Sequence, residues 1–301
     1  MIFSTDLFKK LQNLFIEKKF NQLEFEIETL GDLSKLPNKI LMFYAVSKAL
    51  NPNSQTNDYK LSSFYFEKIY SEDNSNREAF YNLIFTSVKA VSFSYLEPHL
   101  LNEYKKNEND PKILEGLAKM NFFYNNMSEV TKYYEKLLKL NKNYSNIWSS
   151  FLASFNYHQN FNQKQYLDFC KKFDETPKIE IENFKKNFQN KKIKIGFLSS
   201  DFKSHSVAFF LEDFVLKINK EDFELNALSN LDHSEHDDMT LKLKSSFDNW
   251  FDVKNLSDEE LVKFSRSLKL DILIDLSGYT DNNRINVLRS ICAPIQISWL
   301  G

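Results

Sequence analysis

The sequence has little cysteine and no long apolar run. Its 301 residues include two cysteines, Cys170 and Cys292, which lie far apart and form neither a CxxC nor a cysteine–histidine spacing. This pattern indicates buried or idle thiols in a reducing compartment. No apolar stretch approaches the ~18 residues of a membrane-spanning helix, and the N-terminal MIFSTDLFKKLQNLF lacks the features of a signal peptide. We therefore expect a cytoplasmic protein with no membrane partner.

An excess of charge of either sign is also missing. Lys and Arg total 39, Asp and Glu total 41, and the formal net charge is -2. A nucleic-acid-binding surface would need a basic stripe, and a charged binding tail would need a run of like charges. Neither is present, so no nucleic-acid partner is expected. Hydrophobic residues make up 42% of the chain, which is enough for a buried core and argues against global disorder.

Residues 1 to about 170 are expected to be entirely helical. Apolar residues recur at spacings of three and four, as at Leu7, Leu11 and Leu14, so each helix has one apolar face. The breaks between helices are short and contain asparagine, aspartate or proline. Pro111, which follows an aspartate, fits the start of a helix because proline is tolerated in a first turn and aspartate caps it.

An internal repeat indicates how these helices are organised. The segment YFEKI at 65–69 matches YYEKL at 133–137, and this offset is twice 34. A period of 34 is that of tetratricopeptide helix pairs, which must stack on neighbouring pairs to bury their apolar faces. The intervening unit around Leu100 fits only with a slip of about one residue. We expect a helical-pair solenoid that offers a concave surface to an extended peptide, with an irregular helical bundle as the alternative.

After a charged segment at 171–191, expected to be a linker, strand and helix patterns alternate. Strands are expected at 193–198, 223–228, 249–253, 272–276 and 295–299, and helices at 207–218 and 256–268. Ser257 is the expected N-cap of the last helix, with Glu260 completing a capping box. The continuous apolar run at 272–276 indicates a strand buried on both faces. This alternation predicts a Rossmann-like parallel sheet covered by helices over residues 192–301.

Two polar loops follow expected strands and precede expected helices. They are SSDFKSHS at 199–206 and DLSGYT at 275–280. In open parallel sheets ligands bind beyond the carboxyl ends of the strands, where free backbone amides can face an anion or a sugar hydroxyl. His205 can accept a proton at neutral pH, and Asp201 can fix its tautomer and raise its basicity. A histidine near a helix start is also often only a cap.

Six segments of residues 192–301 resemble, in order and spacing, the start of the catalytic region of the O-GlcNAc transferase (SPINDLY-type) enzymes, glycosyltransferase family 41. They are KIKIGFLSSDFKSHSVAFFLE (192–212), FELNALSN (223–230), DDMTLKL (237–243), LSDEELVKF (256–264), DILIDLSGYTDNNR (271–284) and APIQISWLG (293–301). The resemblance implies the first lobe of a GT-B glycosyltransferase. In the family the nucleotide-sugar lobe follows this point, so we expect the 301 residues to be a front portion that is inactive alone.

The resemblance implies transfer of N-acetylglucosamine from UDP-GlcNAc to serine or threonine hydroxyls of proteins, with inversion and without a cofactor or metal. The helical repeats would help to select the protein acceptors. In the family the histidine and the aspartate of the D-F-x-x-H stretch line the donor and acceptor pocket, and both have a claim to be the general base. These roles fall on His205 and Asp201, with the identity of the base left open.

The donor- and acceptor-binding positions that the resemblance implies are Gly278, Tyr279, Thr280, Arg284, Leu300 and Gly301. From the residues alone, Gly278 permits close backbone approach and Thr280 supplies a hydroxyl, although an ordinary strand-to-helix turn also accounts for both. Packing is the expected duty of Pro294 and Gln296. The segment FNYH at 155–158 resembles the N-Y-H-P segment of the family, but glutamine replaces the proline, so a site role for His158 has little support.

One cluster has the residue types of a metal site: His233, Glu235, His236, Asp237 and Asp238. The H-x-x-H spacing alone is common, and these residues lie on an expected loop with no visible partners to orient them. We therefore expect no metal. Two other functions stay open. The chain could be a non-catalytic interaction module with an inert lobe, or a related transferase that uses another sugar or acceptor.

Overall fold

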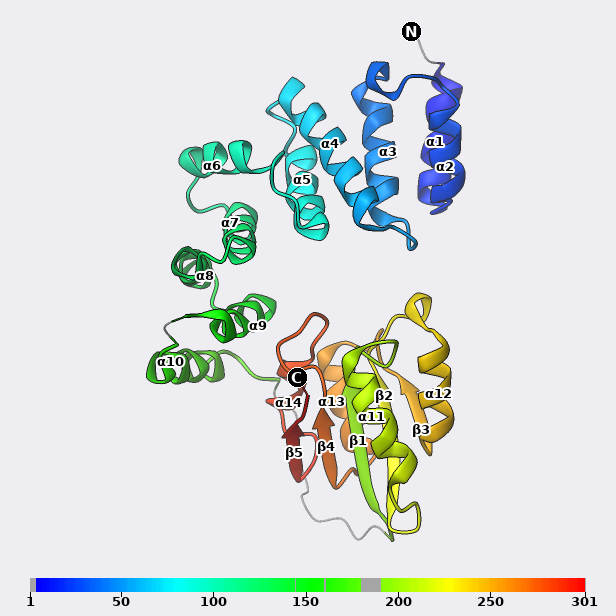
Figure 1. The fold of residues 1–301 in the computed structure, drawn as a ribbon, viewed down its shortest axis with the longest axis vertical. Helices are drawn as coiled ribbons and strands as arrows, with labels where there is room; N and C mark the ends of the chain where they lie inside the picture. The colour runs from blue at the N-terminus through cyan, green and yellow to red at the C-terminus, as the bar shows by residue number, and fades with distance from the viewer. Residues whose placement is uncertain (1–3, 144, 160, 180–190, 301) are drawn as a thin grey trace. The chain divides into compact units, whose positions relative to one another are not determined.

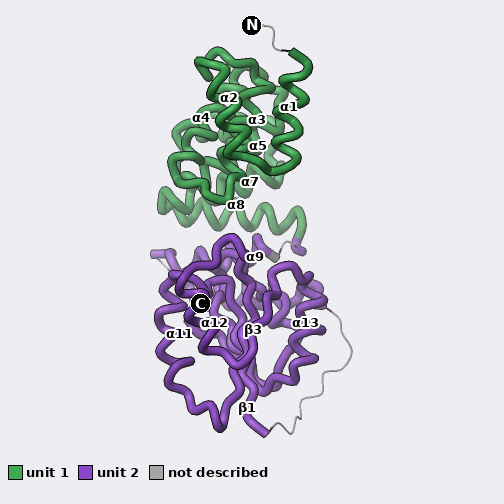
Figure 2. The backbone as a smooth tube through the Cα atoms, turned by 90° about the vertical axis from the view of Figure 1, so that its right-hand side faces the viewer, with its two compact units in different colours: residues 1–141 green, residues 142–301 purple. Residues whose placement is uncertain are grey.

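The chain forms two compact units, residues 1–141 and 142–301 (Figures 1 and 2). The computed structural model describes residues 4–143, 145–159, 161–179 and 191–300. Most of the expected linker, 180–190, and Gly301 lie outside the described residues. No helix in the described ranges is both long enough and apolar enough to cross a membrane.

Residues 1–141 form a tetratricopeptide-like stack of helices (Figure 1). The helices are α1 (Thr5–Ile16), α2 (Phe20–Glu28), α3 (Asn38–Leu50), α4 (Thr56–Glu72), α5 (Arg77–Ala90), α6 (Glu97–Lys106), α7 (Pro111–Phe123) and α8 (Met127–Leu140), with a 3-10 turn η1 (Leu33–Lys35) before α3. Neighbours along the chain pack on each other, as α3 does on α4, α4 on α5, and α7 on α8. Such local packing is that of a solenoid.

The starts of the helices show the period expected from the sequence. Helices α5, α7 and α9 (Ser145–Ser154) begin at positions 77, 111 and 145, in equal steps of one tetratricopeptide period. The repeated Tyr65 and Tyr133 are both buried, on α4 and α8. Helix α6, in the intervening unit, has 10 residues where α4 has 17, and Leu100 is buried there, one period from the buried Phe66 and Tyr134.

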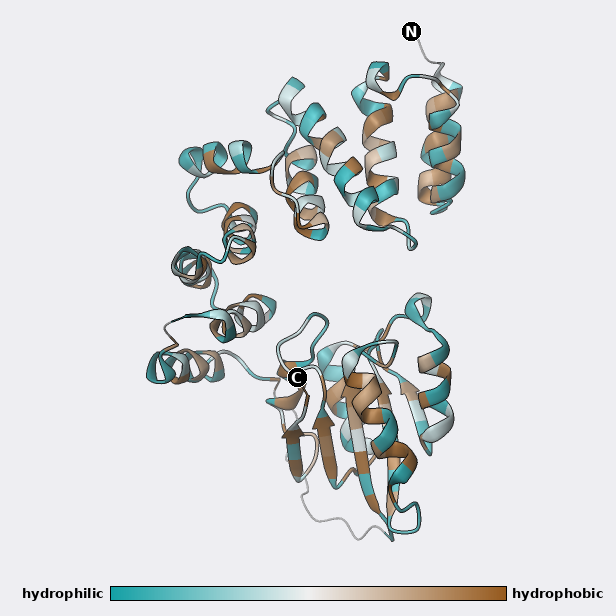
Figure 3. Ribbon diagram, in the orientation of Figure 1, coloured by the Kyte–Doolittle hydropathy of each residue, from teal (hydrophilic) through white to brown (hydrophobic). Residues whose placement is uncertain are grey.

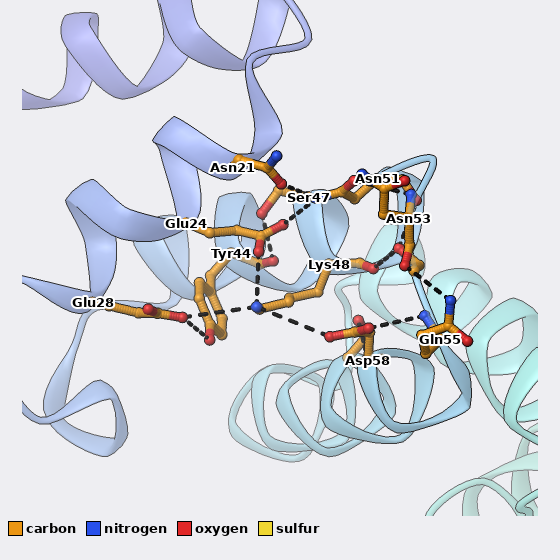
Figure 4. A network of polar contacts seen from close by, with 12 residues as sticks. Asn21, Glu24, Glu28, Tyr44, Ser47, Lys48, Asn51, Asn53, Gln55 and Asp58 are labelled. Atoms are coloured by element: carbon orange, nitrogen blue, oxygen red, sulfur yellow. Dashed lines mark hydrogen bonds and ion pairs between the residues drawn. The ribbon is translucent and has the colours of Figure 1, made fainter. Parts of the chain in front are cut away.

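A polar network around Lys48 joins three consecutive helices (Figure 4). The Nζ atom of Lys48, on α3, lies 2.7 Å from Glu24 and 3.8 Å from Glu28 of α2, and 4.0 Å from Asp58 of α4. Partial burial lowers the pKa of Lys48, but the hydrogen bond and charge of Glu24 and the other two carboxylates outweigh it, so the net pKa is raised. The hydroxyl of Tyr44 donates a 2.7 Å hydrogen bond to Glu28. The lysine therefore stays charged and links α2, α3 and α4.

Residues 142–301 combine α9, the 3-10 turn η2 (Phe155–Tyr157) and α10 (Gln163–Asp174) with a parallel sheet. Its strands are β1 (Ile193–Ser199), β2 (Phe223–Ser229), β3 (Asn249–Asp252), β4 (Ile272–Asp275) and β5 (Ile295–Ser298). They lie in the order β3-β2-β1-β4-β5, and every neighbouring pair is parallel. This arrangement confirms the expected Rossmann-like lobe.

Helices cover both faces of the sheet. Helices α11 (Ser206–Lys217) and α12 (Asp238–Ser246) contribute to one core, and α13 (Asp258–Ser267) and α14 (Ile285–Leu288) contribute to the other. Successive residues of β1 point into opposite cores, Phe197 into the first and Leu198 into the second. Figure 3 shows many hydrophobic residues along the strands and both hydrophobic and hydrophilic residues on each covering helix.

Helices α9 and α10, which the sequence groups with the repeats up to about residue 170, share a compact unit with the sheet. The hydroxyl of Ser149 on α9 donates to Oδ1 of Asn283 (3.3 Å). After α10, Thr176 accepts hydrogen bonds from Arg289 at its hydroxyl (3.0 Å) and at its carbonyl (2.7 Å). These contacts attach α9 and the end of α10 to the segment that follows β4.

Two expectations for the lobe, the capping box of α13 and the burial of β4, have different outcomes. The capping box of α13 is confirmed, because Ser257 and Glu260 each accept a hydrogen bond from the other's backbone. The expectation that 272–276 is buried on both faces is wrong. Ile272 and Ile274 are only half-buried, because they lie at the margin of the first core, next to the largely exposed strand β5.

Candidate active site at the carboxyl edge of the sheet

The two polar loops lie side by side beyond β1 and β4. The strand order reverses between these two strands, and ligands of open α/β sheets bind at such a switch point. The backbone N–H of Ser200 donates to Oγ of Ser277 (3.4 Å), and the hydroxyl of Ser200 donates to the carbonyl of Asp281 (3.3 Å). The structure thus brings together the loops 199–206 and 275–280 that the sequence singles out.

His205 is the N-cap of α11. Its Nδ1 accepts a hydrogen bond from the backbone N–H of Val207 (3.3 Å), and its side chain is half-buried. With Nδ1 as the acceptor, the proton of the neutral imidazole lies on Nε2. His205 in this tautomer can donate a hydrogen bond from Nε2. To accept a proton it would have to break the contact with Val207 or reverse its tautomer.

Asp201 lies in the same loop, shortly before His205. Its backbone N–H donates to Oγ of Ser199 (2.9 Å), and its side chain is half-buried. Burial raises the pKa of the Asp201 carboxyl, and the opposing influence of His205 and Lys203 does not cancel this effect. A raised pKa makes the ionised carboxylate a stronger base.

Asp237 and Thr240 hold this loop in place. They form the capping box of α12. Oδ2 of Asp237 also accepts a hydrogen bond from the backbone N–H of Ser204 (2.7 Å), and the hydroxyl of Thr240 donates to the carbonyl of Phe202 (2.7 Å). Burial alone would raise the pKa of Asp237, but the hydrogen bonds from Ser204 and Thr240 outweigh it and lower the pKa to about 2. Asp237 and Thr240, which form a D-x-x-T pattern, therefore position the loop that carries Asp201 and His205.

Asp275 anchors the second loop. Its buried carboxylate accepts hydrogen bonds from the backbone N–H groups of Gly278 (2.9 Å) and Ser277 (3.3 Å). Burial raises the pKa of Asp275, and these hydrogen bonds only partly oppose the rise. Gly278 has a φ of 53°, in the left-handed region that favours glycine. Asp275 is not among the residues predicted for the site, although an aspartate before a glycine turn is a signal for this geometry.

Tyr279 and Thr280 differ in where their hydroxyls lie. Tyr279 is half-buried, and burial raises its pKa, with further effects from Cys170 and from a hydrogen bond with Tyr166, both on α10. Thr280 is exposed, and its hydroxyl donates to the carbonyl of Ser277 (2.7 Å). Tyr279 therefore joins the loop to α10, and Thr280 keeps lone pairs that can accept from a ligand.

The guanidinium of Arg284 forms hydrogen bonds with other residues of the lobe. It donates to Oδ1 of Asn230 (3.1 Å), to Oδ1 of Asp258 (2.7 Å), and to the carbonyls of Lys254 (3.1 Å) and Leu256 (2.9 Å). The Arg284 side chain is 16% exposed. These bonds join the segments that follow β2, β3 and β4. Most of the donor capacity of Arg284 thus serves the fold, and its contact with a donor or acceptor stays a prediction.

The last positions implied by the resemblance follow β5. The backbone N–H of Trp299 donates to the carbonyl of Asp275 (2.9 Å), so the chain leaves the sheet at the same edge as the two loops. Leu300 is exposed there and has a φ of 67°. Gly301 lies outside the described residues.

Two side chains considered from the sequence make packing contacts. The amide of Gln296 accepts from the backbone N–H of Cys292 and donates to the carbonyl of Leu288, both at 2.7 Å. The ring of His158 stacks on Phe155 with centroids 5.1 Å apart, and burial lowers its pKa. The side-chain amide of Gln296 is therefore hydrogen-bonded within the lobe.

A polar pocket of about 270 Å³ adjoins the second loop. Its walls come from α9 and from the segment after β4, and include Asn146, Ser149, Thr280, Asn282 and Asn283. Amide and hydroxyl groups in such a wall suit a ligand with many hydrogen-bonding groups, such as a sugar or a peptide backbone. Asn282 and Asn283 lie in the family-like segment 271–284, whereas Asn146 of α9 lies in none of the six segments and is far from them in the sequence.

Comparisons with known proteins agree with this geometry. Residues 169–301 match the model of glycosyl transferase family 41. The chain is 26% identical over 181 residues to the probable UDP-N-acetylglucosamine--peptide N-acetylglucosaminyltransferase SPINDLY of Oryza sativa subsp. japonica, covering 56% of this chain and 19% of that protein. It is 32% identical over 113 residues to the probable enzyme of the same activity named SEC of Arabidopsis thaliana, covering 37% and 11%.

A solved structure supports the fold. A mutant O-GlcNAc transferase of Thermobaculum terrenum has a TM-score of 0.65 and 20% identity, covering 88% of this chain and 51% of that one. The chain spans less than a fifth of the length of the two plant relatives. The family match includes both loops of the candidate site and the D-x-x-T pattern that holds the first of them. Residues 169–301 are thus the part of the chain that is similar to glycosyl transferase family 41.

Proposed function

We propose that this chain takes part in protein O-GlcNAc transfer, with residues 192–300 as the first lobe of a GT-B catalytic region. The reaction moves N-acetylglucosamine from UDP-GlcNAc to serine or threonine hydroxyls of proteins and inverts the anomeric centre. One observation carries the proposal: the loops 199–206 and 275–280 meet at the switch point of the sheet. The activity after which the plant relatives are named supports the reaction class.

Asp201 is the better candidate for the general base. Burial raises the pKa of its carboxyl, which brings its basicity closer to that needed at neutral pH. Nδ1 of His205 already accepts from Val207, so its Nε2–H is placed to donate to an oxygen of the acceptor or the sugar. The departing diphosphate would be stabilised by groups of a second lobe. This scheme requires neither a metal nor a cofactor.

Protein acceptors would reach the site by way of the helical repeats. A solenoid offers an extended surface to a peptide, and the pocket beside Asn146 and Asn283 has the polar lining that a peptide backbone needs. A cytoplasmic location fits this proposal, since Cys170 and Cys292 are both free thiols.

The experiment uses the native protein, purified with an antibody from its source cells. It is incubated with proteins of those cells and, in separate tubes, with radiolabelled UDP-GlcNAc, UDP-glucose and UDP-galactose. Label on serine or threonine from UDP-GlcNAc alone is the expected result. Label transferred from UDP-glucose or UDP-galactose would mean that the protein uses that donor instead of UDP-GlcNAc. No label from any of them, together with retained capture of peptides by the repeats, would favour a non-catalytic interaction module.

A further inference from the structure

Two histidines and an aspartate converge at the edge of the sheet beyond β3. His233 lies in the 3-10 turn η3 (His233–Glu235), His236 follows that turn, and Asp252 ends β3. One nitrogen of each imidazole and one oxygen of Asp252 all lie within 4.8 Å of one another. Nε2 of His233 lies 3.8 Å from Oδ2 of Asp252, and the centroids of the two imidazole rings are 4.7 Å apart.

The carboxylate of Asp252 is held in a defined orientation. Nε1 of Trp250 donates a 3.0 Å hydrogen bond to Oδ1 of Asp252, which leaves Oδ2 directed at His233. The turn that carries the histidines is also fixed, because Asp232 accepts from the backbone N–H of Ser234 (2.9 Å). Hydrogen bonds that orient the ligating groups are a property of metal sites in proteins.

One ring nitrogen of His236, Nε2, is buried without a hydrogen-bond partner among the described residues. A buried polar atom without a partner destabilises the fold. A cation bound at this atom would supply the missing partner.

We propose that His233, His236 and Asp252 bind a divalent transition-metal ion, with Zn²⁺ as the favoured ion. Two imidazoles and one carboxylate suit Zn²⁺, whereas Mg²⁺ and Ca²⁺ prefer oxygen ligands alone. Bonds of about 2.0–2.2 Å to the three ligands require the side chains to draw together by small rotations. A fourth position would remain for water or another ligand.

This site differs from the cluster that the sequence suggests and that led us to expect no metal. The Glu235 carboxylate pairs with Lys203 (2.5 Å), and Asp237 caps α12, so neither completes a ligand set with the histidines. The third ligand is Asp252, which is separated from His233 in the sequence by the whole of α12. Only the parallel pairing of β2 with β3 brings it near.

The metal would act on the loop that carries His205. Residues between the two histidines and just after them hold that loop, through the contact of Glu235 with Lys203 and the hydrogen bond of Asp237 with Ser204. An ion that fixes His233 and His236 would therefore restrain residues 203 and 204 as well. This role is separate from the proposed sugar transfer, which uses no metal.

The test is isothermal titration calorimetry of the full chain with ZnCl₂. The protein carries no histidine tag and is first freed of metal with a chelator. We expect one ion per chain, and at least a tenfold loss of affinity in His233→Ala and in Asp252→Asn. His99→Ala is the matched control, because His99 also faces a carboxylate, that of Glu67 at 3.1 Å, but lies in residues 1–141. Bound Co²⁺ should give visible absorption bands in the wild-type chain and in His99→Ala only.

His233 is exposed, so His233→Ala should fold like the wild type, which thermal unfolding without metal would show. Unchanged Zn²⁺ affinity in His233→Ala would overturn the proposal. So would the absence of saturable binding by the wild type, or an equal loss in His99→Ala. Mg²⁺ binding at this site with the affinity of Zn²⁺ would also contradict it.

Discussion

Oδ2 of Asp237 accepts a 2.7 Å hydrogen bond from the backbone N–H of Ser204, while Oδ1 of the same carboxylate accepts from the backbone N–H of Thr240 at 3.0 Å. One side chain therefore caps α12 and holds the loop that contains Asp201 and His205. Asp237 does not have to touch a substrate to affect activity, since it holds the loop that carries both proposed catalytic residues.

Replacing Asp237 by alanine should lower the free energy of unfolding by about 1–2 kcal/mol, the usual effect of losing an N-cap. Asp237→Asn keeps a capping side chain and removes only the charge. The folded pKa of about 2 lies below the ordinary aspartate value of 3.8, so the charge stabilises the fold above about pH 4 and stops doing so as pH falls towards 2. The difference between wild type and Asp237→Asn in urea unfolding should therefore vanish on acidification. Asp238→Asn, on an exposed neighbour, is the control, and an equal effect there would refute the assignment.

The roles of Asp201 and His205 can be separated by variants that preserve the cap of α11. Measured in a protein that also carries the second lobe, Asp201→Asn should reduce kcat for transfer by about 10²–10⁴-fold, the range for a lost general base. His205→Asn can still accept from the N–H of Val207 but has no ring nitrogen, so it should lose at least tenfold in kcat without a change in thermal stability. His205→Ala should in addition lower the free energy of unfolding by about 1 kcal/mol, because it removes the N-cap of α11.

The raised pKa of Asp201 adds a signature in the pH profile. The acidic limb of kcat/KM should lie above the ordinary range of an aspartate and should disappear in Asp201→Asn. Near-normal turnover of His205→Asn would remove His205 from the catalytic residues, and a full acidic limb in Asp201→Asn would remove Asp201 as the base.

Arg284→Ala should destabilise the lobe. Removing one partner of a fully buried ion pair costs about 3–5 kcal/mol, and we expect about 2–3 kcal/mol here because Asp258 is partly exposed. Urea unfolding measures this loss. Lys263→Ala removes the exposed pair with Glu259 and should change stability by less than about 1 kcal/mol. If Arg284→Ala retained full stability and lost donor binding, Arg284 would be a ligand-binding residue instead.

Lys48→Met should destabilise residues 1–141 by about 2–4 kcal/mol, because it leaves the nearly buried Glu24 without its cation. Adding Glu24→Gln to Lys48→Met should recover part of the loss, which a double-mutant cycle would measure. Lys10→Met breaks an exposed pair with Glu26 and serves as the control. Equal losses of stability for Lys48→Met and Lys10→Met would show that the network in Figure 4 stabilises residues 1–141 no more than an exposed ion pair does.

Features set by neighbouring residues could be predicted from the sequence. The capping box of Ser257 and Glu260 involves residues one helical turn apart, the tetratricopeptide period follows from repeated apolar faces, and β1 is a short apolar run before a polar loop. The polar loops could be placed at one edge because the carboxyl ends of parallel strands meet there.

Contacts between distant segments could not be predicted in this way. Arg284 bonds to the segments that follow β2 and β3, Asp252 lies near the two histidines, and Asn146 and Asn283 line one pocket. No local pattern predicts these contacts, because they depend on how the sheet and its connections are arranged. The half-burial of Ile274 has the same origin, since it depends on which elements lie over β4.

The parallel pairing of β1 also has a consequence for the chain during synthesis. Helix pairs of the solenoid contact mainly their neighbours, so each can form soon after it leaves the ribosome. Ile195 of β1 pairs with Ile272 of β4, which is made only after β2, β3 and the helices between them. At about 5–20 residues per second, β1 waits on the order of 4–15 s for that partner. The central apolar strand is therefore the segment that a chaperone would have most reason to shield.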